Sequence, residues 1–353
     1  MAYKIGYIDP SFNTPEELIM AANLIPYRIF GDPTIDLMDA NKFVPPNHCF
    51  WARNCLQRGL NGLDKEIKGI IITHACDCSN REYDIWFYHV SYDFYYFLNA
   101  PLKRDKISLK FFINDLKELK FQLEEHFGVE ITDKKLYEAI NLTNEIRKLL
   151  KKISEYRNKG LLLGSEFHAI IKNAYKSVKK DVLHNLKEKL KKLENKEPLP
   201  YVDGSKKRIL LTGSILDDTE ILIYLESLGF EIITDDLCIG TRYFHNKIEI
   251  TGDPIKDIAI FHLSKPPYST EHPSSGRFDF IKGLAEKYQV QGVICLVQKF
   301  CEPLLYEYPF FRDSFKETGM PFIFLEKEYK RDSYNQLTTK LEAFKEISRG
   351  VKK

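Results

Sequence analysis

The sequence lacks the features that would assign it to several large classes of protein. It contains no run of 18 apolar residues, which is about what a helix needs to cross a bilayer. Its first residues lack the charged and then apolar run of a signal peptide. Neither sign of charge is in excess, with 52 Lys and Arg against 50 Asp and Glu, so nothing points to a phosphate-backbone partner. We therefore expect a cytoplasmic protein that binds neither membrane nor nucleic acid.

The chain also lacks a nucleotide-binding phosphate loop and any internal repeat. No segment matches G-x-x-x-x-G-K-S/T, so any use of ATP must come from a partner. No solenoid period and no low-complexity segment interrupts the 353 residues, of which 44% are hydrophobic. A chain of this length and composition can bury a large core, and its length favours two domains over one.

The seven cysteines are odd in number, and in a reducing compartment this argues against a disulfide framework. The roles that remain possible for these cysteines are metal binding, catalysis and simple burial in the core. Cysteines follow three β-rich runs: Cys76 and Cys78 after residues 69–73, Cys238 after residues 230–234 and Cys301 after residues 290–297. Any one cysteine is more often a small buried filler, but these share a position at strand ends, where parallel sheets bind ligands. Thiolates gathered there suit an iron–sulfur cluster.

β-rich runs alternate with helical patterns in two parts of the chain, residues 1–103 and 206–353. We predict strands at residues 4–8, 24–30, 67–73, 208–212, 231–234, 257–263, 290–297 and 321–325. We predict helices at residues 14–22, with Thr14 as N-cap, and at 49–60, 217–228, 277–288, 311–318 and 334–347. This alternation is typical of parallel sheets covered on both faces, so the fold class is α/β with two doubly wound (Rossmann-like) domains.

The stretch between these two parts, residues 104–205, is predicted to be a helical connector. Helical patterns cover residues 109–127, 133–158, 165–173 and 177–195. In the second of them, apolar residues recur at three- and four-residue steps, which gives one stripe: Leu136, Ile140, Thr143, Ile146 and Leu150. The turn formers of residues 197–205 make the best boundary before the C-terminal domain.

Motifs along nearly the whole chain resemble those of one known family. In order they are Pro15-Glu-Glu-Leu-Ile, Ala21-Ala-Asn-Leu-Ile-Pro-Tyr-Arg28, Cys49-Phe-Trp-Ala-Arg-Asn-Cys55, His74-Ala-Cys-Asp77, Tyr83-Asp-Ile-Trp86, Gly213-Ser214, Asp235-Asp-Leu-Cys-Ile-Gly-Thr-Arg-Tyr-Phe244, Lys299-Phe-Cys-Glu-Pro303 and Gln336-Leu-Thr-Thr-Lys-Leu-Glu-Ala-Phe344. Their order and spacing are similar to those of the 2-hydroxyacyl-CoA dehydratase D-component family. That family also holds benzoyl-CoA reductase subunits and double-cubane cluster proteins.

The resemblance implies a [4Fe–4S] cluster in the cleft between the two domains, held by three cysteines with one iron left open. Matched motif by motif, these ligands are Cys49, Cys76 and Cys301. The other cysteines are second-tier candidates and allow a double-cubane [8Fe–9S] cluster: Cys55, Cys78, Cys238 and Cys295. Of these, Cys78 could replace Cys76 as the ligand, and Cys295 lies inside a predicted strand, where we expect it to point into the packing.

The function that the resemblance implies is that of an anaerobic lyase component. In such an enzyme an ATP-hydrolysing iron–sulfur activator injects one electron, and a ketyl radical of the 2-hydroxyacyl-CoA substrate then loses water. A related interpretation is a component of an ATP-dependent reductase that acts on a CoA ester. The alternative is a double-cubane reductase or electron-relay protein that acts on small molecules without a CoA ester. A chain that has kept the fold and lost the cluster is a third interpretation. Family members work in pairs, so we expect a dimer, with itself or with a homologous subunit.

Four further features allow a functional and a structural interpretation. Arg242 could bind a carboxylate or a CoA phosphate, or form an ion pair with Asp235 or Asp236. Ser214 follows a predicted strand and could help to hold an anion, or it could be the N-cap of an ordinary turn. His74 could donate a proton near a cluster or be a hydrogen-bonded structural histidine. The aromatic run at residues 92–97 could form a pocket wall, a subunit interface or part of the core.

Overall fold

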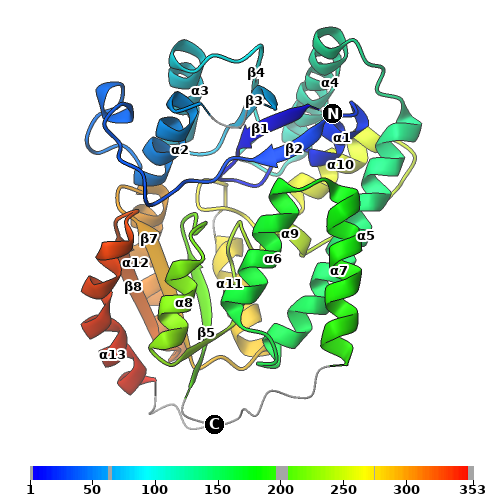
Figure 1. The fold of residues 1–353 in the computed structure, drawn as a ribbon. Helices are drawn as coiled ribbons and strands as arrows, with labels where there is room; N and C mark the ends of the chain where they lie inside the picture. The colour runs from blue at the N-terminus through cyan, green and yellow to red at the C-terminus, as the bar shows by residue number, and fades with distance from the viewer. Residues whose placement is uncertain (1–2, 63–65, 196–205, 274, 349–353) are drawn as a thin grey trace.

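The computed structural model describes residues 3–62, 66–195, 206–273 and 275–348. The strands in this part of the chain form two four-stranded parallel sheets, and helices cover them (Figure 1). The predicted α/β class with two Rossmann-like parallel-sheet units is confirmed. The boundary expected at residues 197–205 lies outside the described residues.

The two sheets have the same strand order. The N-terminal sheet is ordered β2-β1-β3-β4, from β1 (Lys4–Ile8), β2 (Ile25–Arg28), β3 (Ile67–Thr73) and β4 (Phe94–Leu98). The C-terminal sheet is ordered β6-β5-β7-β8, from β5 (Lys207–Gly213), β6 (Phe230–Asp235), β7 (Gly292–Gln298) and β8 (Phe322–Lys327). In each sheet the strand order reverses beside its first strand, between β1 and β3 or between β5 and β7. Sheets of this kind bind ligands in the crevice at the carboxyl ends of such a strand pair.

Helices alternate with these strands on both sides of a helical middle segment. The N-terminal part contains α1 (Glu16–Ala21), the 3-10 helix η1 (Ala40–Lys42), α2 (Phe50–Leu60) and α3 (Asp77–His89), and the middle segment contains α4 (Lys106–Phe127), α5 (Asp133–Asn158), α6 (Gly164–Lys176) and α7 (Lys179–Glu194). The C-terminal part contains α8 (Glu220–Ser227), α9 (Thr241–Phe244), α10 (Pro254–Leu263), α11 (Ser275–Lys287), α12 (Glu302–Thr318), the 3-10 helix η2 (Arg331–Leu337) and α13 (Thr338–Ile347). Across the described residues, no helix combines the length and the apolar character needed to span a membrane.

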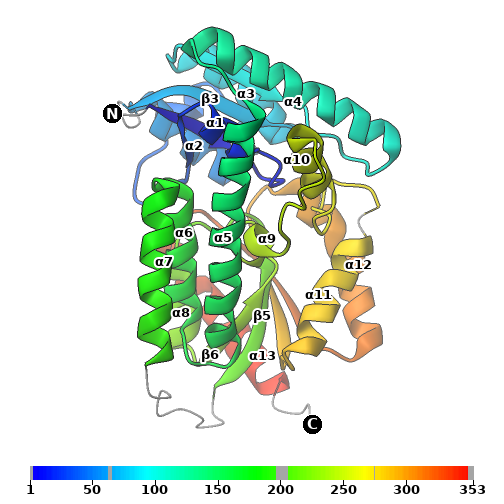
Figure 2. The same cartoon turned by 90° about the vertical axis from the view of Figure 1, so that its right-hand side faces the viewer.

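The middle segment packs against both sheets. Helix α5 runs alongside the two halves of the molecule (Figure 2) and contacts α1 on one side and α9 and β6 on the other. Its predicted apolar stripe is confirmed, because Leu136, Ile140 and Ile146 are buried. Helix α6 contacts both β2 and β6. The core of the N-terminal sheet therefore continues through this segment towards the C-terminal half.

The strand predicted at residues 257–263 is wrong, because this run belongs to α10. The side chain of Asp253 accepts a hydrogen bond from the backbone N–H of Lys256 at 3.1 Å, and Pro254 occupies the first turn, so the local sequence starts a helix. The helix packs against α4 and α5, and most of its residues are buried. A helix buried on most sides presents a short continuous apolar run, which periodicity alone does not distinguish from a strand.

Two smaller expectations also differ from the structure. Thr14 does not cap α1, because its Oγ1 lies 2.7 Å from Oγ1 of Thr73 and Pro15 takes the cap position. The aromatic run at residues 92–97 leads into β4, a strand that we did not predict. Aromatic residues are common in strands, and Tyr95 of this strand donates a hydrogen bond to the Trp86 carbonyl at 3.1 Å, which ties the strand to α3.

Candidate functional site

A cavity lies where the carboxyl edges of the two sheets face each other. It contains about 380 Å³ of space not filled by atoms, including its mouth. Its lining residues are Pro10, Cys49, Trp51, Ala52, Cys76, Cys78, Ser79, Ser214, Ile215, Tyr268, Gln298 and Cys301. They include residues that follow or end β1, β3, β5 and β7. The places where the strand order reverses in the two sheets therefore both contribute to one cavity. We call this space the cysteine cavity.

Three of its cysteines occupy equivalent positions, because each immediately precedes a helix. Cys49 precedes α2, Cys76 precedes α3 and Cys301 precedes α12. A side chain at this position faces the unbonded N–H groups of the first turn and the positive end of the helix dipole. Two helix N-termini from the N-terminal half and one from the C-terminal half therefore direct sulfur atoms to one place.

Aromatic side chains next to two of these cysteines stack on each other. The rings of Phe50 and Phe300, which adjoin Cys49 and Cys301, have centroids 6.0 Å apart and lie 5° from parallel. The guanidinium of Arg53 lies 4.1 Å from the centroid of the Phe50 ring. Phe300 has a left-handed backbone with a φ of 67°, which costs an L-residue roughly 1–2 kcal/mol. The surrounding fold therefore fixes the turn that presents Cys301.

The thiols gain nothing from being close to one another. Burial raises the pKa of Cys49 to about 12, and the neighbouring thiols of Cys76 and Cys78 add to the shift, because thiolates would repel each other. Burial likewise raises the pKa of Cys76 and of Cys301, although backbone N–H groups in the first turns of their helices act in the opposite direction. Without a metal, Cys49, Cys76 and Cys301 are uncharged near neutral pH.

The donor set fits an iron–sulfur cluster. Four soft thiols share the cavity with mainly apolar walls, and its lining residues include no carboxylate and no imidazole. Among the residues that the structure describes, no three potential ligands are gathered closely enough to hold a single metal ion. A cluster spreads its thiolates over several irons, so it takes ligands that stand further apart than those of one ion. The predicted ligands Cys49, Cys76 and Cys301 thus line one cavity, with Cys78 as a fourth thiol.

The other three cysteines lie outside the lining of the cavity. Cys55 is fully buried in the core on α2. Cys238 is buried with its Sγ 3.6 Å from Nη2 of Arg28. Cys295 is buried within β7 and packs with Val297 and Leu304. These positions are those of packing residues.

Ser214 lines the cavity and joins two strands at its floor. Its Oγ accepts a hydrogen bond from the backbone N–H of Gln298 at 2.7 Å, which ties the end of β5 to the end of β7. Gly213 before it has a φ of 144°, and a Cβ there would lie 1.8 Å from the Leu296 carbonyl oxygen, so only glycine allows this close approach. Ser214 is not an N-cap, because α8 begins only at Glu220.

His74 and Arg242 have structural partners. Nδ1 of His74 lies 2.8 Å from the Ala100 carbonyl oxygen. The buried guanidinium of Arg242 forms an ion pair with Asp236 at 2.7 Å and also donates to the carbonyls of Pro266 and Pro267. The structure therefore shows the ion pair and the hydrogen-bonded histidine that were the structural alternatives, and neither side chain is among those that line the cysteine cavity.

The sequence reasoning missed a buried pair beside the cysteine cavity. Nε2 of His48 lies 2.8 Å from Oε1 of Glu82, and both residues are buried. Burial opposes a charge on His48, but hydrogen bonds with Cys78 and Glu82 outweigh it and raise the pKa of His48 to about 9. His48 directly precedes Cys49 and Glu82 lies one helical turn beyond Cys78. The sequence could have indicated this pair, because both residues lie close to candidate cysteine ligands.

Two Rossmann-like sheets that bring thiols from three helix N-termini to one cavity define an α/β protein with a thiol-lined cavity between its sheets. Residues 11–347 match the model of the family described as 2-hydroxyglutaryl-CoA dehydratase, D-component. The chain belongs to this family, as the motifs indicated.

Individual relatives match along most of their length. The chain is 27% identical to the (R)-phenyllactyl-CoA dehydratase beta subunit of Clostridium sporogenes, covering 94% of this chain and 89% of the relative. It is 26% identical to the (R)-2-hydroxyglutaryl-CoA dehydratase subunit beta of Acidaminococcus fermentans, and the match covers 95% of this chain and 90% of the relative. It is 24% identical to a benzoyl-CoA reductase subunit of Thauera aromatica, and the match covers 88% of this chain and 82% of the relative.

Proposed function

We propose that the protein is the iron–sulfur subunit of a 2-hydroxyacyl-CoA dehydratase-type enzyme. The observation that carries this proposal is the convergence of three helix-capping thiols, from both halves of the molecule, on one cavity. Family membership supports it, because the relatives are named as subunits of CoA-ester dehydratases and of a benzoyl-CoA reductase. The reaction is the removal of water from a 2-hydroxyacyl-CoA through a ketyl radical of the substrate, after ATP-driven one-electron activation by a partner.

In this proposal Cys49, Cys76 and Cys301 hold a [4Fe–4S] cluster, which supplies one-electron transfer and one open iron position. The walls formed by Trp51 and Ile215 keep bulk water away from the cavity. The stacked rings of Phe50 and Phe300 close the space beside Cys49 and Cys301. The ion pair of His48 and Glu82 fixes the side of the cavity that carries Cys78.

Partners complete the proposed enzyme. The chain has no phosphate loop, so an iron–sulfur activator hydrolyses the ATP. A homologous subunit or a second copy of this chain forms the dimer. A groove of about 610 Å³, lined by Phe50, Arg53 and Asn41 among others, shares Phe50 with the aromatic pair beside the cysteine cavity and has room for part of an acyl-CoA.

Anaerobic purification followed by iron and sulfide analysis and electron paramagnetic resonance tests the proposal. We expect about four irons per chain. Cys301→Ser should lower the iron content and the melting temperature together, because the cluster joins the two halves. The matched control is Cys295→Ser, which lies six residues earlier, inside β7 and its packing, and should retain iron. A wild-type protein without iron would refute the proposal.

The alternative is a double-cubane reductase or electron-relay protein that acts on small molecules without a CoA ester. The fourth thiol in the cavity, Cys78, is the observation that favours it. It requires about eight irons per chain. Loss of iron in Cys295→Ser as well as in Cys301→Ser would support this alternative over the first proposal.

The proposed pairing is tested by sedimentation under anaerobic conditions. We expect a dimer, either of this chain alone or with a homologous subunit added in equal amount. A chain that stays monomeric in both experiments would contradict the pairing and leave the iron analysis unaffected.

A further inference from the structure

A second cavity, lined by buried residues, lies on the other side of the loop that follows β1. It contains about 270 Å³ of space not filled by atoms, including its mouth, and the centre of a water-sized guest fits in about 20 Å³ of it, which is room for one or two such guests. Its lining residues are Tyr7, Asp9, Phe12, Thr14, Glu16, Arg28, Arg147, Tyr175, Tyr243, His262 and Lys265. They come from the N-terminal sheet, from α5 and α6 of the middle segment, and from α9 and the region of α10. We call this space the polar cavity.

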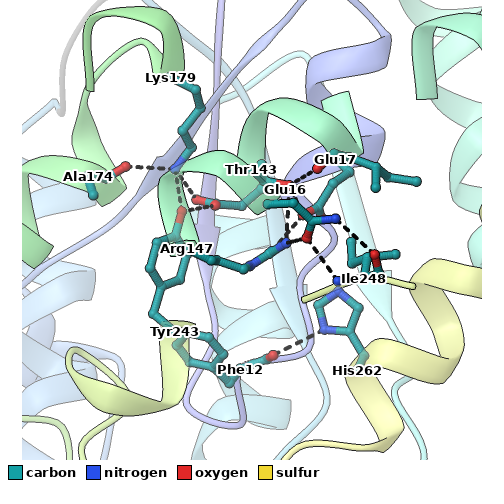
Figure 3. Close-up of polar contacts among 12 residues, drawn as sticks. Phe12, Glu16, Glu17, Thr143, Arg147, Ala174, Lys179, Tyr243, Ile248 and His262 are labelled. Carbon is teal, nitrogen blue, oxygen red and sulfur yellow. Dashed lines mark hydrogen bonds and ion pairs between the residues drawn. The ribbon is translucent and has the colours of Figure 1, made fainter. Parts of the chain in front are cut away.

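The carboxylates around the polar cavity already have partners. Glu16 accepts hydrogen bonds from Tyr7, Tyr243 and Lys179 at 2.7–2.8 Å, and Figure 3 shows part of this network. Glu17 accepts from Thr143 and Arg147 at 2.7 and 2.6 Å. The two oxygens of Asp9 accept the backbone N–H groups of Phe12 and Thr14, at 2.6 Å each. These contacts pair Lys179 with Glu16 and Arg147 with Glu17.

Two buried cations that line the cavity have no carboxylate partner among the described residues. Arg28 is 1% exposed; its Nη2 donates to the Asp9 carbonyl oxygen and contacts Cys238, and its Nε has no hydrogen-bond partner. Lys265 is 4% exposed, donates to the Phe12 carbonyl oxygen and lies 2.8 Å from Nδ1 of His262. The aromatic rings of Phe12 and Tyr175 flank Arg28 at 5.6 and 4.9 Å. Rings supply a partial negative surface but no counter-charge.

The charges of this region do not balance. The cations are Arg28, Arg147, Lys179 and Lys265, and the carboxylates are Asp9, Glu16 and Glu17. One positive charge is therefore in excess among buried side chains, where an uncompensated charge costs several kcal/mol. Burial and the Arg147 charge lower the pKa of Lys265 to about 7, although the charges of Asp9, Glu17 and Glu271 act in the opposite direction, so these carboxylates do not fully compensate the buried ammonium.

Unpartnered donors also surround the cavity. Nδ1 of His262 lies 2.8 Å from Nζ of Lys265 and 3.2 Å from the Phe12 carbonyl oxygen (Figure 3). When Lys265 is charged and donates to Nδ1 over the shorter distance, the ring proton sits on Nε2, and this buried nitrogen has no hydrogen-bond partner. Together with Nε of Arg28, it provides a second unpartnered N–H group among the lining residues. Excess positive charge, unpartnered donors and a small space between buried residues are the features of a site for a small anion.

We propose that the polar cavity binds a monovalent inorganic anion of the size of chloride, held by Arg28, Lys265 and His262. The part of the cavity that admits the centre of a water-sized guest, about 20 Å³, suits a single-atom anion better than a polyatomic one such as phosphate. The anion balances the charge that joins the N-terminal sheet to the middle segment and to α10. This site is separate from the cysteine cavity and does not depend on the proposed function, although the same two loops border both: Asp9 and Lys265 line one cavity, and Pro10 and Tyr268 the other.

Bromide, which replaces chloride and scatters anomalously, provides the test. Crystals of the anaerobically purified full-length protein grown in bromide should show an anomalous peak in contact with Arg28 and Lys265. In solution, chloride should raise the melting temperature by roughly 2 °C per tenfold increase at constant ionic strength set with methanesulfonate, a polyatomic anion that suits this space less well.

Lys265→Gln removes the one positive charge in excess and should abolish both effects. The control is Lys327→Gln, which also replaces a lysine that is only 4% exposed but lies outside this cavity, and whose protein should keep the chloride dependence. Water alone in the cavity of the wild type, or a bromide peak that Lys265→Gln leaves unchanged, would overturn the proposal. If Lys265→Gln does not fold, the wild-type bromide map decides the question.

Discussion

The two cavities between the sheets are neighbours with opposite chemistry. The cysteine cavity gathers thiols whose pKa values rise because they are buried and close together, so the fold holds them in place without any gain from their contacts. The charges around the polar cavity bind one another: Glu16 and Glu17 of α1 pair with Lys179 of α7 and Arg147 of α5. The thiols form no such pairs, whereas these paired charges join α1 of the N-terminal part to the helices of the middle segment.

The largest expected effect comes from breaking the bonded side of this comparison. Arg147→Met removes the partner of Glu17, and both side chains are almost completely buried. The uncompensated carboxylate should lower the free energy of unfolding by about 3–5 kcal/mol, as measured in denaturant titrations. The control, Lys187→Met, breaks a 3.9 Å pair with Glu145 in which both side chains are more than half exposed, and should cost less than about 0.5 kcal/mol. Equal losses in the two variants would show that the buried pair contributes no more to stability than an exposed pair does.

A smaller effect is expected from acid at a second contact between the middle segment and the C-terminal half. His168 of α6 lies between the Leu216 carbonyl oxygen and Thr219, at 2.8 and 3.0 Å. Burial and the Lys172 charge lower the pKa of His168 to about 4. Because the unfolded chain binds this proton near pH 6.5 and the folded chain does not, stability is full above pH 6.5 and falls as the pH drops towards 4.

This histidine alone should account for about 3 kcal/mol over that range. Unfolding curves of His168→Gln and of the wild type at pH 7, 5.5 and 4.5 measure the difference. The variant should lose less stability on acidification than the wild type. Parallel losses in both proteins would mean that other groups cause the acid sensitivity.

The smallest effect should come from the cysteine cavity when no metal is present. Cys49→Ala in metal-free protein removes a thiol that has no favourable interaction with the other thiols, so the free energy of unfolding should change by less than about 1 kcal/mol. The same substitution should cost more in protein that contains iron, because metal binding contributes to folding. A large loss in the metal-free protein would show that the thiols pack for stability, and the contrast between the cavities would then disappear.

Most of the fold could be predicted because its strands and helices follow simple periods. The run at residues 67–73 is short, β-branched and bounded by turn residues, and it forms β3. The stripe on α5 repeats at helical steps and is buried as predicted. The segment at residues 257–263 could not be read in this way, because α10 is covered on several sides by helices that are distant in the sequence.

The sequence also predicted which loops would meet, but not how each side chain would be used there. Cys76 and Cys301 follow the ends of β3 and β7, and parallel sheets bring such ends to one edge, whereas Cys49 lies in the long segment between β2 and β3 and was assigned from the family motif. Whether Arg242 bound a ligand or Asp236 depended on the path of residues 266–267, whose carbonyls complete its hydrogen bonds. The charge balance of the polar cavity depends on seven side chains from separate segments, and no local pattern encodes it.

The distribution of the three helix-capping thiols along the chain has a consequence for synthesis. Cys49 and Cys76 lie in the first sheet unit, and Cys301 lies just beyond β7 of the second. A ribosome-bound chain therefore presents two of the three sulfurs long before the third. The proposed cluster, if it needs all three, can be completed only after residue 301 has left the ribosome, and chains truncated before that residue should not retain it.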